Sequence, residues 1–148
     1  KNHIKIDQGS KIITEYQVTT AKVHDSVVLE DLLNESDIRK PLWGDSAYMG
    51  KNCAKVIRKY RMKNLTNKQG CRHKTLSEYH KKKNHQKSKV RARVEHVFGF
   101  VWQNLSGSTP FRNIGLDRIA SSIGLQNIVY NLFRAVYLIE AKNMLIKL

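Results

Sequence analysis

Acidic residues are scarce in this chain of 148 residues. It holds 12 Asp and Glu against 27 Lys and Arg, which gives a formal net charge of +15 at pH 7. A charge of this size says little about the fold, but it selects the partners that a protein binds. The scarcity of acids therefore predicts a polyanionic partner, with nucleic acid first and an anionic membrane surface second.

Cysteines and long apolar runs are also scarce. The two cysteines, Cys53 and Cys71, form no CxxC pair, so nothing indicates a disulfide framework, and a reducing compartment is the simplest interpretation. No signal peptide is recognisable. The longest uncharged run near the C-terminus, residues 119–133, is too short and too polar to span a bilayer. These absences favour a cytoplasmic protein with no segment that spans a membrane.

Length and composition suit one domain over residues 1–148, because 41% hydrophobic residues is ordinary for a globular protein with a core. Alternating and β-rich sequence at 1–7 and 11–20 predicts an antiparallel hairpin. Its turn lies at 8–10, where Gly9 is able to take a positive φ. The chain starts directly in strand-like sequence and without methionine, so we expect it to be a fragment of something longer.

Apolar residues at helical spacing predict the helices. One is expected over 27–33, with Asp25 or Ser26 as its N-cap, and a second after Gly50. One or two more are expected from Gly115 to the end. Their apolar positions are assigned to the core, and include Leu116, Ile119, Ile123, Ile128, Leu132, Val136 and Ile139.

Residues 58–93 form a basic segment with 14 Lys or Arg and a single acid, Glu78, among 36 residues. Such a composition is typical of a solvated, partly mobile segment that orders on a polyanion and contacts phosphates without reading sequence. A solvated loop with no partner is the alternative. The residues expected to contact nucleic acid are Lys81, Lys82, Lys83, Lys87, Lys89, Arg91 and Arg93.

Glu95 follows this basic segment by two residues. It lies in a helix predicted over residues 87–102, KSKVRARVEHVFGFVW, which overlaps the end of the segment. Val90, Val94, Val97, Phe98 and Val101 form an apolar stripe along the predicted helix. Arg91 and Glu95 are four residues apart, so they lie one turn from each other on a neighbouring face. Glu95 is either half of a surface ion pair or a metal-binding carboxylate beside an arginine.

Asp45 is the second acid of interest, because it follows the short apolar strand expected at Leu42 and Trp43. It either caps the next turn or lies at a sheet edge where ligands bind in α/β folds. If Asp45 and Glu95 converge, their repulsion favours a divalent cation between them, and oxygen ligands suit Mg²⁺ or Mn²⁺. Together with a basic surface, such a site is typical of phosphoryl transfer on nucleic acid.

Several motifs follow one another along the chain. They are KNHIKID at 1–7, VTTAKVHDS at 18–26, LWGDSAY at 42–48, KSKVRARVEHVFGF at 87–100, and IGL-x2-I-A with IGLQN-x2-YN-x2-R at 114–134. VRARVEHVFGF is the most specific of them. In these motifs and their order, the chain resembles the C-terminal catalytic part of bacterial insertion-sequence transposases of the DDE class, in the IS-five group of the IS-four superfamily.

The resemblance implies an α/β, ribonuclease-H-like fold, in which a mixed sheet is flanked by helices and which is N-terminally truncated here. It implies that Asp45 and Glu95 are the second and third acids of the catalytic triad, and that Arg91 orients phosphate or carboxylate. Two Mg²⁺ or Mn²⁺ ions, double-stranded DNA at transposon ends and targets, and a homodimer are the implied partners. The implied activity is DNA strand cleavage and strand transfer, in the bacterial cytoplasm with the nucleoid.

The chain departs from the family pattern at three places. The family's first catalytic aspartate lies on a strand before KNHIKID, and neither Asp7 nor Asp25 occupies its position, so we expect the chain alone to be inactive. Ser88 replaces a tyrosine, and Trp102 stands where the superfamily often has lysine. Trp102 is expected to pack, or else to stack on a flipped base.

Two other functions remain open at this point. The chain is either a catalytically inactive transposase remnant that only binds DNA, or a ribonuclease-H-like nuclease that acts on RNA.

Overall fold

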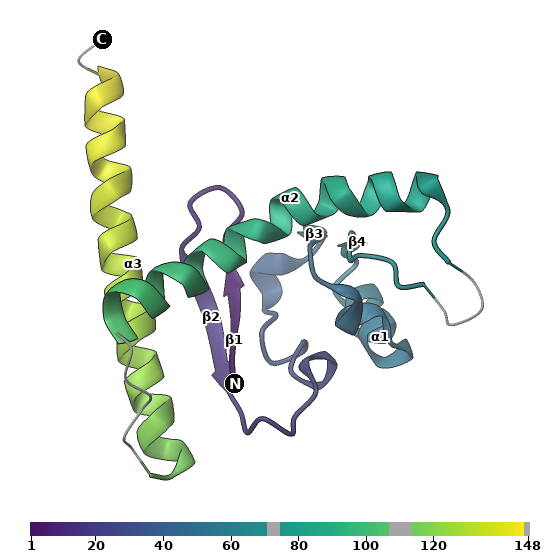
Figure 1. The fold of residues 1–148 in the computed structure, drawn as a ribbon, viewed down its shortest axis with the longest axis horizontal. Helices are drawn as coiled ribbons and strands as arrows, with labels where there is room; N and C mark the ends of the chain where they lie inside the picture. Colours follow the sequence, from purple (N-terminus) through teal and green to yellow (C-terminus); the bar gives the residue numbers. More distant parts are fainter. Residues whose placement is uncertain (71–74, 107–113, 147–148) are drawn as a thin grey trace. The chain divides into compact units, whose positions relative to one another are not determined.

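The computed structural model describes residues 1–70, 75–106 and 114–146 (Figure 1). The chain divides into two compact units. Unit 1 consists of Lys1–Thr20 and Arg93–Leu148, and unit 2 consists of Ala21–Ala92. The helix α2 (Glu78–Phe100) runs through the boundary, so it contributes residues to both units.

Unit 1 begins with the predicted hairpin. Strands β1 (Asn2–Ile6) and β2 (Ile13–Val18) pair antiparallel, and the register shifts between Lys5 and Ile6. The positive φ of the connection falls on Lys11, at 61°, rather than on Gly9. Asp7 holds the turn, because its Oδ2 accepts the backbone N–H of Ser10 at 2.7 Å and the hydroxyl of the same residue at 2.8 Å.

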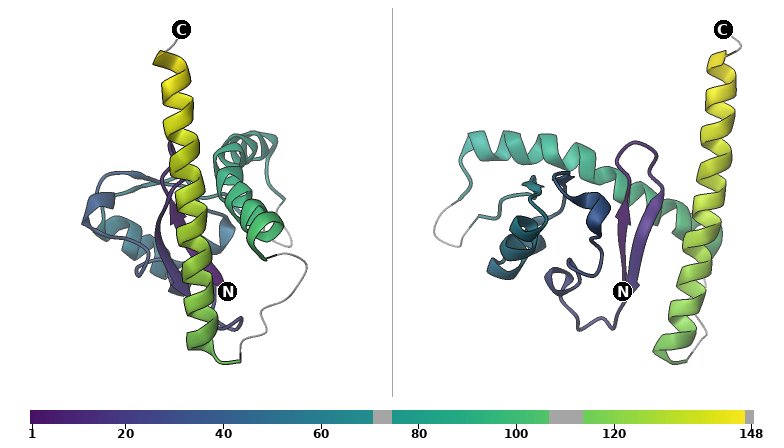
Figure 2. Two further views of the ribbon diagram at one scale, coloured as in Figure 1. Left: turned by 90° about the vertical axis from the view of Figure 1, so that its left-hand side faces the viewer. Right: turned by 180° about the vertical axis from the view of Figure 1, so that it is seen from behind.

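The second part of unit 1 is α3 (Leu116–Ile146), a single helix that lies along the hairpin (Figure 2). The buried core of unit 1 consists of Ile13 from β2, Val97 from α2 and Tyr130 from α3. Val97 is fully buried, so this part of the predicted apolar stripe of α2 is confirmed, whereas Phe98 is 40% exposed. The short π-helical turn η4 (Val101–Ser106) follows α2.

Three polar side chains of α3 hydrogen-bond to the backbone of the hairpin. The amide of Asn131 accepts the N–H of Ile13 and donates to its carbonyl, both at 2.9 Å. The Tyr130 hydroxyl donates to the carbonyl of Lys11 at 3.0 Å, and Arg134 Nε donates to the carbonyl of Ser10 at 2.6 Å. We call Tyr130, Asn131 and Arg134 the hairpin clamp, and it accounts for the YN-x2-R motif in terms of folding.

The rest of α3 departs from the sequence prediction. Ile123 is buried as expected, but many apolar side chains assigned to the core are exposed. The physical reason is that α3 has apolar residues on all of its faces, whereas the hairpin and the end of α2 cover only one face. The exposed ones among those assigned to the core are Leu116, Ile128, Leu132, Val136 and Ile139, and the neighbouring Leu125, Phe133 and Tyr137 are exposed as well.

Unit 2 is built around α1 (Lys51–Lys59), which confirms the helix predicted after Gly50. Its buried Cys53 and Ile57 pack against Leu29 and Leu33. Leu29 and Leu33 do not belong to an α-helix, so the helix predicted over 27–33 is wrong. Only Val27 of this range lies in a helical turn, the 3₁₀ turn η1 (Asp25–Val27). A second 3₁₀ turn, η2 (Glu35–Asp37), follows the range, and Asn34 and Asp37 form its capping box.

The strands of unit 2 are short. β3 (Pro41–Leu42) and β4 (Lys63–Asn64) pair in parallel, and the 3₁₀ turn η3 (Ser46–Met49) links β3 to α1. The observed fold is therefore mixed α/β, with two small sheets among the described residues rather than one continuous sheet. Within 1–70, 75–106 and 114–146, no helix has both the length and the apolar content needed to cross a membrane.

We expect Asn131→Ala to destabilise the protein by about 1–3 kcal/mol, because it leaves both backbone hydrogen-bonding groups of Ile13 without their partner. Asn143→Ala is the matched control, since Asn143 is exposed on the same helix. Urea denaturation followed by circular dichroism measures both variants. Equal stability of the two variants would show that the amide contacts of Asn131 contribute nothing to the fold.

Candidate active site and nucleic-acid interface

Asp45 lies just beyond the carboxyl end of β3. The parallel backbone pairing continues past the strand, because Leu65 donates to the carbonyl of Leu42 at 2.9 Å and Asn67 donates to that of Gly44 at 3.1 Å. Asp45 is thus held at the end of a parallel ladder, the position at which open α/β sheets bind ligands.

Asp45 also caps η3, as one of the two sequence interpretations expected. Its Oδ1 accepts the backbone N–H of Ala47 at 2.9 Å. This bond occupies one lone pair of one carboxylate oxygen and fixes the orientation of the group. Capping therefore does not exclude metal ligation, because the other oxygen keeps its acceptor capacity.

Gly44 and Tyr48 pack closely beside this carboxylate. A Cβ placed on Gly44 would lie 2.9 Å from Cδ2 of Tyr48, so glycine is required by the approach of the ring and not by a positive φ. Burial, and then the negative charges of Asp25, Asp45 and Cys53, raise the pKa of Tyr48 to about 12. The Tyr48 hydroxyl therefore stays neutral to a higher pH than an ordinary tyrosine does.

Asp25 is not the N-cap that the sequence predicted, and neither is Ser26. The cap of η1 is His24, whose Nδ1 accepts the backbone N–H of Ser26 at 3.2 Å. Asp25 occupies the first turn of η1, which packs on η3 within unit 2. Its negative charge, like that of Asp45, raises the pKa of Tyr48.

Glu95 lies on the part of α2 that belongs to unit 1, and it is exposed. Arg91, one helical turn earlier, is partly buried and belongs to unit 2. The structure thus confirms that both residues lie on one helix. Asp45 and Glu95 belong to different units, so their convergence stays a prediction.

The helix that carries Glu95 starts at Glu78, well before the predicted start at Lys87. Residues 78–93 of the basic segment are therefore helical rather than a mobile chain. The reason is that lysine has a high helix propensity, which apolar periodicity does not detect.

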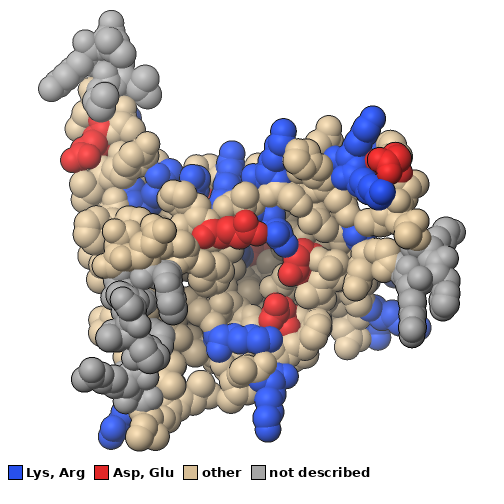
Figure 3. Space-filling model, in the orientation of Figure 1, with Lys and Arg blue, Asp and Glu red and all other residues tan. Residues whose placement is uncertain are grey.

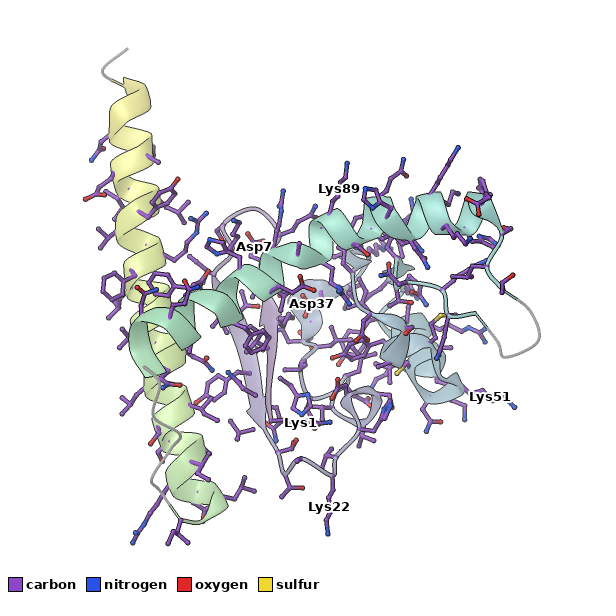
Figure 4. The ribbon with its side chains drawn as sticks, in the orientation of Figure 1. Lys1, Asp7, Lys22, Asp37, Lys51 and Lys89 are labelled. Atoms are coloured by element: carbon purple, nitrogen blue, oxygen red, sulfur yellow. The ribbon has the colours of Figure 1, made fainter. Side chains whose placement is uncertain are left out.

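The basic residues of α2 fall into two groups. Lys81, Lys82, Lys83 and Lys89 are exposed, and Lys89 extends from the helix in Figure 4. Figure 3 shows Lys and Arg side chains gathered along the part of the surface that α2 forms. Four ammonium groups are thus available to a polyanion, although Lys81 also contacts Glu78 at 2.8 Å.

The second group has partners inside the protein. Lys87 Nζ donates to the carbonyl of Thr66 at 2.8 Å, and burial followed by the charges of Lys68 and Lys83 lowers its pKa. A guanidinium N–H of Arg93 donates to the carbonyl of Gln8 within unit 1. These two cations therefore also hold the fold together.

Residues 66–68 form a segment, called the strap below, that hydrogen-bonds to side chains of α2. These contacts were not predicted from the sequence. The Asn84 amide accepts the N–H of Lys68 at 2.9 Å and donates to its carbonyl at 2.8 Å. Asn67 Nδ2 donates to Ser88 Oγ at 3.0 Å. The only signal in the sequence is that Asn84 and Ser88 are four apart and hence on one face of a helix.

The donor atoms present suit a divalent metal in type. Carboxylate oxygens of Asp45 and Glu95 are hard ligands of the kind that Mg²⁺ and Mn²⁺ prefer. Within the part of the chain that the structure describes, no group of three or more His, Cys, Asp or Glu could hold a metal ion. The predicted role of Trp102 lies outside the described side chains.

Comparison with known proteins identifies a family for nearly the whole chain. Residues 1–132 match the family described as "Transposase DDE domain". No curated protein and no solved structure matches the chain. The matched residues include Asp45, Glu95 and the whole basic segment. The family implies a ribonuclease-H-like fold, of which the described residues form small, separate pieces of sheet.

Alkaline pH should destabilise the protein through Tyr48. Because the folded-state pKa is raised from 10.0 to about 12, the stability linked to the neutral hydroxyl is complete below pH 10.0 and is lost as the pH rises through 12. Between pH ~9 and ~12, we expect the wild type to lose about 2 kcal/mol relative to Tyr48→Phe.

Urea denaturation across this pH range measures the difference. Tyr137→Phe is the control, because Tyr137 is 58% exposed and should follow the wild type. Parallel pH profiles of the wild type and Tyr48→Phe would contradict the assignment.

Proposed function

The chain belongs to the Transposase DDE domain family, and from this membership we propose that it is catalytic sequence of an insertion-sequence transposase. The family cleaves and transfers DNA strands. The finer assignment, to the IS-five group of the IS-four superfamily, is supported by the motifs that resemble that group. The matched residues contain all of them except the last two positions of YN-x2-R.

We propose that Asp45 and Glu95 are the second and third acids of the catalytic triad. The observation that carries this proposal is the place of Asp45, oriented by Ala47 at the carboxyl end of a parallel strand pair in a chain of this family. Glu95 supports it, because it is an exposed carboxylate on the helix that also carries the basic residues.

DDE transposases use divalent metal ions. In this chain Asp45 and Glu95 would hold Mg²⁺ or Mn²⁺, and two ions are proposed in the complete site. When bound, the metal stabilises negative charge on the phosphodiester and activates the attacking oxygen. The N–H of Ala47 keeps the Asp45 carboxylate in one orientation, and Arg91 is proposed to orient phosphate or carboxylate near Glu95.

The proposed partner is double-stranded DNA, at transposon ends and at the target. The exposed lysines of α2 supply the attraction to phosphate, while Lys87 and Arg93 combine phosphate contact with their internal bonds. Such contacts set affinity and position without reading sequence.

We further propose a single partial catalytic domain over residues 1–148, and a homodimer that brings two ends together in the bacterial cytoplasm. Two ends require two copies of the catalytic site, and sedimentation of the DNA complex measures their number. A complex with one copy per pair of ends would contradict the homodimer.

DNA binding should depend on the lysines of α2 and on salt. We expect the triple variant Lys81→Gln, Lys82→Gln, Lys83→Gln to weaken binding to duplex DNA. It should also flatten the plot of log K against log salt by about 2–3, since each phosphate contact contributes about 0.9 to the slope. Fluorescence anisotropy at several salt concentrations measures both quantities.

The matched control removes the same charge from exposed lysines away from α2, with Lys22→Gln, Lys51→Gln and Lys55→Gln. It should keep the slope of the wild type. Equal losses in the two triple variants would mean that only net charge matters, and would remove α2 from the interface.

Cleavage should depend on the two acids. In an active transposase that carries this sequence, Asp45→Asn or Glu95→Gln should lower Mg²⁺-dependent strand cleavage by about 10³-fold or more, because several kcal/mol of charge stabilisation is lost. DNA binding should persist. Nicking of end-labelled transposon-end duplexes measures cleavage, and anisotropy measures binding.

Glu140→Gln, which changes an exposed acid on α3, is the control and should cleave normally. Cleavage that survives either active-site change overturns the assignment of that acid. A chain that binds DNA without nicking it would favour the role of a DNA-binding remnant, and preference for RNA–DNA hybrids would favour a ribonuclease.

A further inference from the structure

Tyr79 is an exposed aromatic residue at the start of the basic helix α2. It is 60% exposed, unlike the buried Tyr130, whose hydroxyl serves the hairpin clamp. The Lys83 ammonium lies 4.7 Å from the centroid of the Tyr79 ring, and the His80 ring lies 5.4 Å away at an angle of 57°. The ring is thus positioned by its neighbours, yet most of its surface is open.

The surroundings of this ring are basic and ordered. Lys68 Nζ lies 3.4 Å from Nε2 of His80, and the Asn84 amide holds the backbone of Lys68 to the helix. Lys82 lies three residues after Tyr79 on the same helix, about one turn away, and it is exposed. The acid at the helix start, Glu78, is engaged by Lys81 at 2.8 Å, so its charge is partly offset.

The contacts of Tyr79 give the fold little stability. A cation–π contact at an exposed site is weak, and Tyr79 is 60% exposed. A large planar side chain among lysines is instead what binds single-stranded nucleic acid, because bases stack on the ring while ammonium groups neutralise the backbone.

We propose that Tyr79, with Lys83, Lys68 and Lys82 around it, is a stacking site for an unpaired nucleotide. Every base has a π-face, so the site would accept bases without strong sequence preference. A paired duplex hides these faces except at its ends, so the site distinguishes unpaired strands from intact duplex. This inference rests on the proposed function, and it names the form of nucleic acid that one end of α2 binds.

The test compares two fluorescein-labelled probes, a single-stranded oligothymidine and a blunt duplex, by anisotropy. Tyr79→Ala should weaken binding of oligothymidine by about tenfold, since stacking contributes about 1–3 kcal/mol per base, and should leave duplex binding almost unchanged. Tyr79→Phe and Tyr79→Trp should retain binding, because both keep a planar ring.

Tyr137→Ala is the matched control. Tyr137 is 58% exposed and has the Arg134 guanidinium 4.8 Å from its ring centroid, but it lies on α3 in unit 1, whereas Tyr79 and the lysines near it belong to unit 2. This variant should bind both probes as the wild type does. A loss equal to that of Tyr79→Ala would overturn the stacking site, because any exposed tyrosine would then serve.

The remaining outcomes separate this inference from the proposed function. If Tyr79→Ala weakens both probes equally, or neither, the stacking site is overturned while duplex binding still supports a DNA partner. If the unaltered chain binds neither probe, both proposals fail. Quenching of the new fluorescence in Tyr79→Trp by oligothymidine, beyond that of the wild type, would support direct stacking.

Discussion

One interaction recurs in both units and holds their parts together. An asparagine amide on a helix accepts the N–H and donates to the C=O of a single residue on a neighbouring segment. Asn131 binds Ile13 in this way in unit 1, and Asn84 binds Lys68 in unit 2. The Asn131 pair is partly buried, where unpaired backbone groups are costly, so it satisfies the two groups of Ile13 at a strand edge. The Asn84 pair is exposed, so it fixes the position of Lys68 rather than satisfying desolvated groups. Each amide therefore makes the same two hydrogen bonds that a residue of a neighbouring strand would make, in a protein whose sheets are small.

The candidate site depends on the second of these pairs. Asn84 fixes Lys68, the adjoining Asn67 donates to the carbonyl of Gly44, and Gly44 precedes Asp45. A continuous set of bonds thus connects the basic helix to the carboxylate at the end of β3. The basic helix α2 and the segment that carries Asp45 are therefore connected by hydrogen bonds within unit 2.

The sequence allowed prediction of those features that depend on local pattern. Alternation predicted the hairpin, apolar spacing predicted α1, and Asp45 was expected at a strand end and found there. Features set by tertiary partners were missed. The start of α2 was misplaced because its first turns are lysine, histidine and asparagine with no apolar stripe, and Leu29 and Leu33 are buried without a helix. Nothing in the spacing of Asn84 or Asn131 reveals which backbone each one binds.

The few acidic residues of the chain have identifiable structural roles. Asp7 closes the hairpin turn and Asp37 completes a capping box, so both act within their own segments. Glu30 instead pairs with Lys59 at the end of α1, at 2.6 Å. Asp45 caps as well, but it is distinguished by its place just beyond the carboxyl end of a parallel strand pair, where open α/β sheets bind ligands. One N–H bond leaves most of the acceptor capacity of its carboxylate unused. That capacity and that place are the physical reasons for proposing Asp45, rather than an acid with a purely local task, as a metal ligand.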